Sequence, residues 1–186
     1  MNVTDGYVTD TFGDNDTISG IELFDGTSLS DEFHGSDENN EFNGREGDDV
    51  LYGGAGDDVL HGGNGKDTLN GGAGQDYRQG GDGDDTLHGG DGEDWLYGQL
   101  GDDVLDGGDG FDRIDFRGST ASVVVDFDTG TATGVAIGTD QLVNIERAIG
   151  SNFNDRLNGS NTLGDAWESY TGGLGNDTIN GAGGND

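Results

Sequence analysis

The sequence predicts an all-β fold in which short parallel strands stack into a β-solenoid, and two observations support that prediction. Eight nine-residue blocks run without a gap from Gly44 to Asp115, and each fits the frame G-G-x-G-x-D-x-U-x, where U is a large apolar residue. Position 4 of the frame is glycine and position 6 is aspartate in all eight blocks. A period of this kind indicates stacked repeats, because one block alone buries almost no apolar surface.

Each block is predicted to be half turn and half strand. The glycines supply turns with positive φ. The apolar residue at position 8 has mostly polar neighbours, as expected of a short strand with one buried face. The residues that this pattern places in the core are Leu51, Leu60, Leu69, Leu87, Leu96, Leu105 and Ile114.

One block departs from the core pattern, because Arg78 stands at position 8 between Leu60 and Leu96 on the adjacent rungs. An unpaired guanidinium in that column would be strongly unfavourable. A register shift of one residue exchanges the two faces of a strand. We therefore expect a local slip that turns Tyr77 inward and Arg78 outward.

Composition alone would favour a disordered linker, since the chain has 40 glycines, 29% hydrophobic residues and a formal charge of -32. A linker, however, has no reason to keep aspartate and leucine in phase over eight blocks. The excess of 39 acidic over 7 basic residues argues against a nucleic-acid partner. There is no cysteine to form a disulfide. Neither an N-terminal apolar signal nor a membrane-spanning stretch is predicted.

No catalytic motif is present in the sequence. The patterns G-x-S-x-G, H-E-x-x-H, Walker and G-x-G-x-x-G do not occur. The three histidines, His34, His61 and His88, all fall at position 9 of a block, and His61 and His88 are expected on opposite faces. We predict that this chain is not itself an enzyme.

Residues 44–115 resemble the RTX (repeats-in-toxin) family, the haemolysin-type calcium-binding nonapeptides of type I-secreted bacterial proteins, and Gly173 to Asn180 gives a further match. The resemblance implies a right-handed parallel β-roll with two blocks per coil and calcium ions stacked between turns 18 residues apart. Rungs ~4.8 Å apart can bring two aspartates and several carbonyls together, and calcium takes about 6 to 8 oxygen ligands. The resemblance also implies a secreted or cell-surface protein.

The ligand pattern of that family transfers to two lines of aspartates, one on each side of the roll. The first line is Asp49, Asp67, Asp85 and Asp103, and the second line is Asp58, Asp76, Asp94 and Asp112. At each site the earlier turn supplies the carbonyls of positions 2 and 4, and the later turn those of positions 1 and 3. Three spaces per side imply about six complete calcium sites. Two carboxylates without thiolate or clustered imidazole favour calcium over zinc or copper.

The implied carbonyl ligands follow from the same pattern. On the first side they belong to Arg45, Gly47, Gly62, Asn64, Gly63, Gly65, Gly80, Asp82, Gly81, Gly83, Gly98 and Leu100. On the second side they belong to Gly54, Gly56, Gly71, Ala73, Gly72, Gly74, Gly89, Asp91, Gly90, Gly92, Gly107 and Asp109. Arg45 and Gln99 replace glycine at position 2, so the geometry of these two turns is in question, although a carbonyl is still present.

The flanks contain a longer repeat, since residues 16–36 align without gaps to residues 140–160 at an offset of 124. Four blocks, at 26–34, 35–43, 150–158 and 163–171, keep position 6 polar and position 8 apolar but lack most turn glycines, and we expect degenerate coils with partial or no calcium. Between them, Val123, Val125 and Phe127 alternate with Val124 and Asp126, which suggests longer strands in a cap or widened coil.

The expected organisation has four parts. Residues 1–43 are degenerate coils, 44–115 the regular roll, 116–149 the cap or widened coil, and 150–186 a second, truncated block of repeats. We expect a fragment of a larger secreted protein that acts as a calcium-triggered folding switch and rigid scaffold. The alternatives are a noncatalytic substrate-binding or secretion module of an extracellular protease, lipase or polysaccharide epimerase, and a repeat unit of an adhesin or surface-layer protein.

One surface feature suggests a second role. Position 7 reads Tyr77, Trp95 and Arg113 on successive rungs, with Tyr97 beside Trp95. This ladder either stabilises the sheet through cross-strand contacts or offers a stacking platform to a carbohydrate or a partner protein. Other expected partners are calcium and neighbouring domains of the parent chain.

Overall fold

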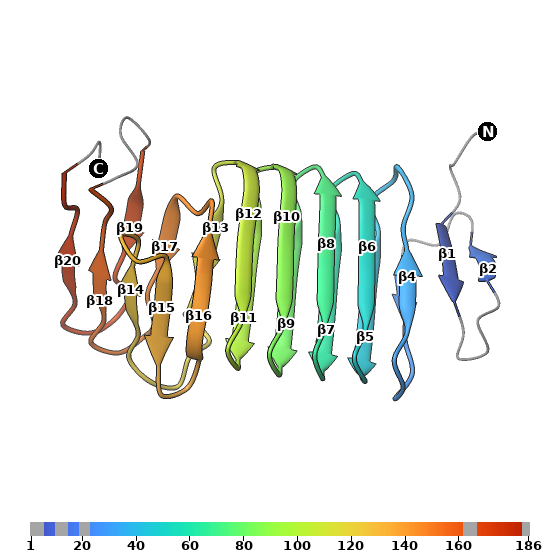
Figure 1. The fold of residues 1–186 in the computed structure, drawn as a ribbon, viewed down its shortest axis with the longest axis horizontal. Coiled ribbons are helices and arrows are strands. Elements are labelled where there is room, and N and C mark those ends of the chain that lie inside the picture. Colours follow the sequence, from blue (N-terminus) through green and yellow to red (C-terminus); the bar gives the residue numbers. More distant parts are fainter. Residues whose placement is uncertain (1–5, 10–14, 19–22, 162–166, 184–186) are drawn as a thin grey trace.

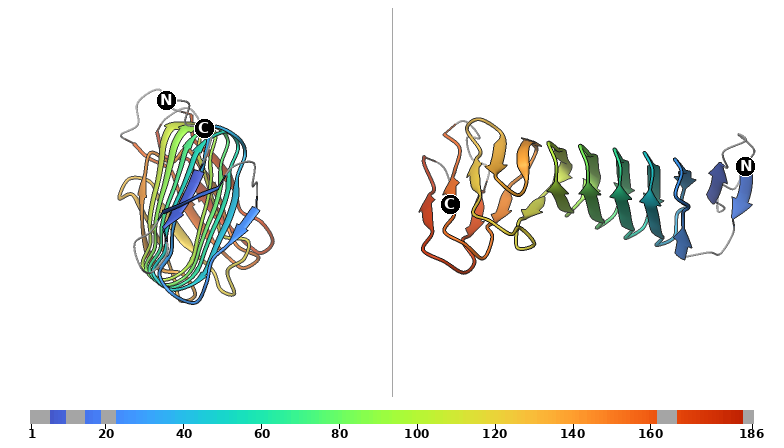
Figure 2. Two further views of the ribbon diagram at one scale, coloured as in Figure 1. Left: turned by 90° about the vertical axis from the view of Figure 1, so that its right-hand side faces the viewer. Right: turned by 90° about the horizontal axis from the view of Figure 1, so that it is seen from below.

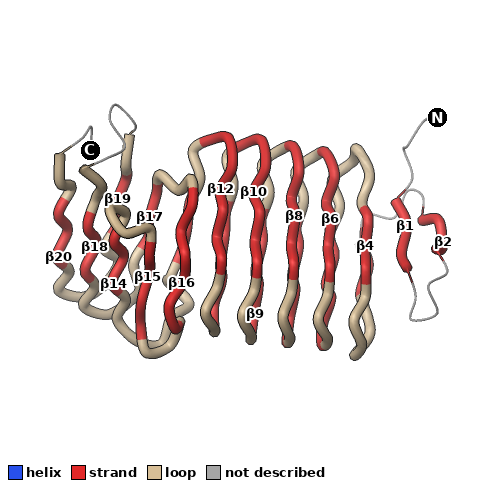
Figure 3. Tube along the Cα trace, viewed as in Figure 1, coloured by secondary structure: helices blue, strands red, loops and turns tan. Residues whose placement is uncertain are grey.

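The computed structural model describes residues 6–9, 15–18, 23–161 and 167–183. Part of the 124-residue alignment, including Ile21 and Glu22, and the first residues of the block at 163–171 lie outside these ranges. The described residues form strands and turns with no helix (Figure 3). The coils stack along one long axis, with the two described ends of the chain at opposite ends of the stack (Figure 1).

Two sheets form the walls of this solenoid, and viewed along the stack they enclose a flattened tube (Figure 2). The twelve-stranded sheet contains, in spatial order, β2 (Asn15–Ile18), β1 (Gly6–Thr9), β4 (Glu32–His34), β6 (Val50–Ala55), β8 (Thr68–Ala73), β10 (Thr86–Gly92), β12 (Val104–Gly110), β16 (Gly138–Val143), β15 (Thr131–Gly134), β14 (Val124–Asp126), β18 (Arg156–Asn158) and β20 (Thr178–Asn180). The eight-stranded sheet contains β19 (Ser169–Thr171), β17 (Arg147–Ile149), β13 (Arg113–Asp115), β11 (Trp95–Leu100), β9 (Tyr77–Asp82), β7 (Val59–Asn64), β5 (Glu41–Glu46) and β3 (Leu23–Asp25).

The register of the regular coils follows the nine-residue frame. Strands pair in parallel with the strand 18 residues away, as in Leu51 with Leu69 and Leu69 with Leu87. Consecutive blocks therefore alternate between the two sheets, and two blocks complete one coil. The predicted all-β parallel solenoid is confirmed.

The core lies between the two sheets, and each sheet contributes one column of inward side chains to it. All seven apolar residues predicted at position 8 are fully buried, and Phe33 and Phe42 continue the two columns toward the N-terminus. Phe33 packs edge-on against Phe42, with ring centroids 5.6 Å apart. Each rung of a sheet in the regular blocks places one side chain in the core, so it contributes little apolar burial of its own.

The expected slip at Arg78 is wrong. Arg78 is fully buried, and it pairs in register with Leu60 on one side and Leu96 on the other. Tyr77 stays on the outer face, half-buried, in line with Val59 and Trp95. The slip is unnecessary because the guanidinium finds carboxylate and carbonyl partners inside the roll.

Residues 116–149 insert an antiparallel unit into the parallel stack. The expected alternation is present, since Val123 and Val125 are buried and Val124 is exposed, but the strand itself, β14, has only three residues. Strands β14, β15 and β16 form an antiparallel unit within the twelve-stranded sheet. Parallel pairing resumes on both sides of it, between β12 and β16 and between β14 and β18.

Candidate calcium-binding ladders

The position-6 aspartates form two continuous ladders, one ahead of each sheet. The first ladder is Asp49, Asp67, Asp85 and Asp103, which precede β6, β8, β10 and β12. The second ladder is Asp58, Asp76, Asp94 and Asp112, which precede β7, β9, β11 and β13. All eight side chains are buried. The two lines predicted from the sequence are thus brought together as lines, one on each side of the roll.

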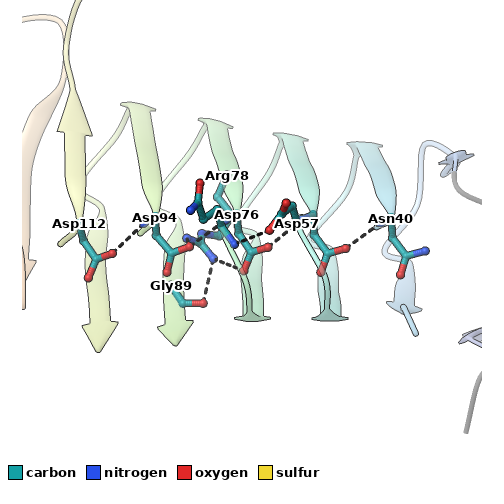
Figure 4. Close-up of polar contacts among 9 residues, drawn as sticks. Asn40, Asp57, Asp76, Arg78, Gly89, Asp94 and Asp112 are labelled. Carbon is teal, nitrogen blue, oxygen red and sulfur yellow. Dashed lines mark hydrogen bonds and ion pairs between the residues drawn. The ribbon is translucent and has the colours of Figure 1, made fainter. Parts of the chain in front are cut away.

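Within a ladder, each carboxylate is tied to the previous rung through one oxygen. The backbone N–H of Asp49 donates to Oδ1 of Asp67 at 2.8 Å, and the N–H of Asp67 donates to Oδ1 of Asp85 at 2.8 Å. The second ladder repeats the arrangement, as in the bond from the N–H of Asp94 to Oδ1 of Asp112 at 2.8 Å (Figure 4). These bonds fix the direction in which each carboxylate points.

The other oxygen, Oδ2, has no hydrogen-bond partner in all but one of these carboxylates. Oδ2 is buried without a hydrogen bond in seven of the eight position-6 aspartates, namely Asp49, Asp58, Asp67, Asp85, Asp94, Asp103 and Asp112. A buried carboxylate oxygen without a partner is strongly unfavourable unless a cation or donor meets it. Seven repetitions of the same unmet acceptor indicate a ligand site rather than a packing defect.

Each of these oxygens points into a space beside a glycine, which we call the inter-rung space. It is bounded by the position-6 carboxylate of one rung and the position-1 carbonyl of the next rung on the same side. A Cβ atom built on Gly62 would lie 2.3 Å from Oδ2 of Asp67 and 2.7 Å from the carbonyl oxygen of Gly80. Position 1 is therefore glycine because any side chain would fill the space.

The electrostatics of the ladders also favour a cation. Burial away from water, reinforced by neighbouring carboxylates, raises the pKa of Asp58 to about 7 and that of Asp85 to about 8 from the ordinary 3.8. Burial likewise raises the pKa of Asp49 and of Asp103 to about 6. A divalent cation in the inter-rung space would stabilise the ionised carboxylates and reverse these shifts.

Backbone oxygens would have to complete any metal site. Among the described residues, no three His, Cys, Asp or Glu side chains come together as a ready-made cluster. Two carboxylates and several carbonyls are a donor set of hard oxygens that suits calcium. The position-3 carbonyls predicted as ligands also serve the backbone: that of Asn64 accepts the N–H of Gly47 at 2.9 Å, and that of Asp82 accepts the N–H of Gly65 at 2.8 Å. A carbonyl oxygen has a second lone pair, so both roles are compatible.

The two substitutions at position 2 keep the turn geometry. Arg45 and Gln99 adopt φ of 80° and 79°, on the same side as the glycines at that position, such as Gly63 at 116°. Their carbonyls therefore keep the orientation of the regular turns.

One inter-rung space differs from the others, that between Asp76 and Asp94. The guanidinium of Arg78 reaches into it from the core (Figure 4). Consequently Asp76 is the one position-6 aspartate of the regular blocks whose Oδ2 has a partner.

In two of the degenerate blocks, local hydrogen bonds occupy the carboxylate oxygen that is unpartnered in the regular blocks. In the block at 26–34, Oδ2 of Asp31 accepts the backbone N–H of Thr27 at 2.7 Å and its hydroxyl at 3.0 Å. In the block at 150–158, Oδ2 of Asp155 accepts the N–H of Ser151 at 2.6 Å. These carboxylates are already satisfied, which supports the expectation of partial or no calcium in the flanks.

Two ladder residues were missed by the sequence reasoning. The N–H of Asp103 donates to Oδ1 of Asp140 at 3.2 Å, and that of Asp112 donates to Oε2 of Glu146 at 2.9 Å, so both ladders continue past the regular blocks. Asp140 is fully buried with an unpartnered Oδ2, and burial raises its pKa to about 8. Asp140 follows one turn glycine, Gly138 at φ 70°, at the frame spacing of positions 4 and 6, whereas no glycine precedes Glu146 at that spacing. A weaker signal, an acid two residues before a buried apolar residue, Leu142 or Ala148, could have found them.

The aromatic ladder lies on the outer face of the eight-stranded sheet. Tyr77 contacts both Trp95 and Tyr97, with ring centroids 6.3 Å and 4.8 Å away. The guanidinium carbon of Arg113 lies 3.4 Å from the ring centroid of Trp95, so one face of that ring is covered by a cation–π contact. These contacts stabilise the sheet.

The comparisons with known proteins agree with this geometry. The family model for the RTX calcium-binding nonapeptide repeat matches the chain in four copies, at residues 25–60, 44–77, 79–114 and 164–186, which together cover more than half of its length. The comparison with curated proteins gave no match. No helix among the described residues is long and apolar enough to cross a membrane.

Proposed function

Because the chain belongs to the RTX calcium-binding nonapeptide repeat family, we propose that it is a calcium-triggered folding switch and a rigid scaffold within a larger secreted protein. The observation that supports the proposal is the row of buried, unpartnered Oδ2 atoms in the regular blocks. The same atoms are hydrogen-bonded in the degenerate blocks at Asp31 and Asp155. This contrast is expected if the regular blocks need a metal ion to fold and the degenerate blocks on either side do not.

The switch follows from charge and core size together. A chain with a formal charge of -32, whose regular rungs each place one side chain in the core, opposes its own compaction through repulsion. Calcium held by the two ladders would bring positive charge to the rows where buried carboxylates are closest. Because the ligands come from different coils, binding and coil stacking would occur together, as in small metal-dependent domains.

The residues proposed to hold calcium are the eight ladder aspartates together with turn carbonyls. The carbonyls of position 1 are placed best, since that of Gly80 borders the same space as Oδ2 of Asp67. The carbonyls of positions 2 and 4 are included because the ligand pattern of the family contains them.

Calcium is scarce in the cytosol and abundant outside the cell, so we propose that the chain is exported unfolded through type I secretion and folds afterwards.

Circular dichroism tests the switch. In excess EDTA we expect a largely disordered spectrum, and millimolar Ca²⁺ but not equal Mg²⁺ should produce a β signal. Mg²⁺ keeps its waters and demands tight octahedral geometry, which a space lined by carbonyls does not provide. A chain that is fully folded in EDTA, or that responds equally to both metals, would contradict the proposal.

A second candidate for the parent protein is a repetitive adhesin or surface-layer protein. The structure adds to the 124-residue sequence repeat, because Thr27 with Asp31 and Ser151 with Asp155 make the same hydrogen bond at equivalent positions. The full reading frame tests it: further units of this period support the surface protein, and a catalytic domain motif supports a secreted protease, lipase or epimerase.

A further inference from the structure

Arg78 is the largest fully buried side chain of the roll, and its contacts are those expected of a metal ion. We propose that the Arg78 guanidinium permanently replaces calcium in the inter-rung space between Asp76 and Asp94, so that this space binds no metal. The inference rests on the proposed calcium-binding function of the other spaces. It lowers the number of calcium sites expected in residues 44–115 from the six implied by the sequence to five.

The contacts of the guanidinium coincide with three of the groups that calcium would use there. Nη1 of Arg78 donates to the carbonyl oxygen of Gly89 at 2.9 Å and to Oδ2 of Asp76 at 3.4 Å. Nη2 forms an ion pair with Oδ1 of Asp94 at 3.0 Å (Figure 4). The two carboxylates and the position-1 carbonyl of this space are thus all engaged by one side chain.

The guanidinium also fills the part of its inter-rung space that stays open in the other inter-rung spaces. A Cβ atom built on Gly71 would lie 1.8 Å from Nη1 of Arg78, which is closer than Oδ2 of Asp76 at 2.2 Å. Beside the matching glycines, Gly53 and Gly62, the nearest atoms belong to the carboxylate and to the next carbonyl, and no cationic side chain is among them. Calcium and the guanidinium cannot occupy the same space, and the guanidinium is covalently attached.

The rest of the side chain explains how an arginine is tolerated in the core. Its aliphatic stem takes the place of leucine between Leu60 and Leu96, while its charged end reaches the second ladder. A buried charge is acceptable when it is paired, and that of Arg78 is paired with Asp76 and Asp94 and hydrogen-bonded through Nη1, whereas Nε and Nη2 make no hydrogen bond. Arg78 therefore supplies both the apolar packing of position 8 and the cation of the ladder. This coil carries its counter-charge in the absence of metal.

Calcium stoichiometry tests the inference. Equilibrium dialysis with metal analysis should give one more bound calcium per chain in Arg78→Leu than in the wild type, because leucine is the usual residue at position 8 and leaves the space open. Lys66→Leu is the matched control, since it removes the same unit of charge from an exposed position and should leave the stoichiometry unchanged.

The outcomes separate this inference from the function on which it rests. Equal stoichiometry in the wild type and in Arg78→Leu would overturn the inference alone. A wild-type chain that binds no calcium would overturn the proposed function, and the inference with it. An increase in the Lys66→Leu control as well would mean that net charge, rather than the space, sets the number of ions, and would also overturn the inference.

A measurement on the wild type decides the matter even if Arg78→Leu does not fold. Crystals grown with calcium should show anomalous scattering peaks in the spaces after Asp49, Asp58, Asp67, Asp85 and Asp94. They should show none between Asp76 and Asp94. A calcium peak bonded to both of those carboxylates would overturn the inference.

Discussion

A single backbone conformation recurs at position 2 of the frame, and two residues with side chains adopt it. Glycine reaches positive φ without strain, whereas other residues do so at a cost of roughly 1–2 kcal/mol. Gln99 and Arg45 bear that cost at φ of 79° and 80°. They share the turn conformation because the strand pairing on either side fixes it.

We predict that Gln99→Gly stabilises the calcium-bound roll by about 0.5–1 kcal/mol, since relief of the strain exceeds the entropy that glycine loses on folding. Urea denaturation at saturating calcium measures the change. Gln79→Ala is the control, because it removes the hydrogen bond between Gln79 and Gln99 without altering a positive-φ residue. A loss of stability in Gln99→Gly larger than that in Gln79→Ala would contradict the prediction.

At the scale of the element, a rung and its neighbours form one unit. Asp85 borders two inter-rung spaces of the first ladder, toward Asp67 and toward Asp103. Asp112 is the last aspartate of the second ladder in the regular blocks, and Glu146 follows it. In a quasi-one-dimensional stack, a defect in the middle breaks coupling on both sides.

We therefore predict that Asp85→Ala lowers the calcium stoichiometry by up to two. It should also raise the calcium midpoint of folding and reduce its cooperativity more than Asp112→Ala does. Isothermal titration with calcium-dependent circular dichroism measures these quantities. Equal losses from both substitutions would instead show that Glu146 completes a further site and makes Asp112 an interior ligand.

At the scale of the whole molecule, the metal-free roll responds to pH through its buried carboxyls. Burial raises the pKa of Asp58 to about 7 and of Asp85 and Asp140 to about 8, from an ordinary value of 3.8. The folded metal-free chain thus binds more protons than the unfolded chain across this window, so its stability falls as pH rises from about 4 to 8.

The effect of pH on folding is expected to reverse when calcium is present. In EDTA, acidification from pH 8 to pH 5 should increase the β signal, whereas the calcium concentration needed for folding should fall as pH rises from 6 to 8, because protons compete for the same carboxylates. Circular dichroism over this range measures both. A calcium midpoint independent of pH would show that the ladder carboxyls are ionised before calcium arrives.

The parts of the fold and of the candidate site that could be predicted from the sequence are those that repeat. The solenoid, the core columns and the two lines of aspartates follow from residues in phase, because a nine-residue frame fixes which side chains face inward. Arg78 was misjudged because its partners, Asp94 and Gly89, lie on the next rung of the same side and become neighbours only after stacking. Asp140 and Glu146 escaped because an antiparallel insertion interrupts the nine-residue period, so that only Gly138 of the usual turn glycines precedes Asp140 and none precedes Glu146.

The direction of the hydrogen bonds between coils has a mechanical consequence. In the two sheets these bonds run along the stack, so tension applied between its ends would load them, and the ions between rungs, one coil after another. We expect the roll to behave as a stiff rod in saturating calcium and to peel open coil by coil at lower force as the calcium concentration falls toward the midpoint of folding. Force spectroscopy would then record a staircase of small extensions, and the force at each step would depend on the calcium concentration.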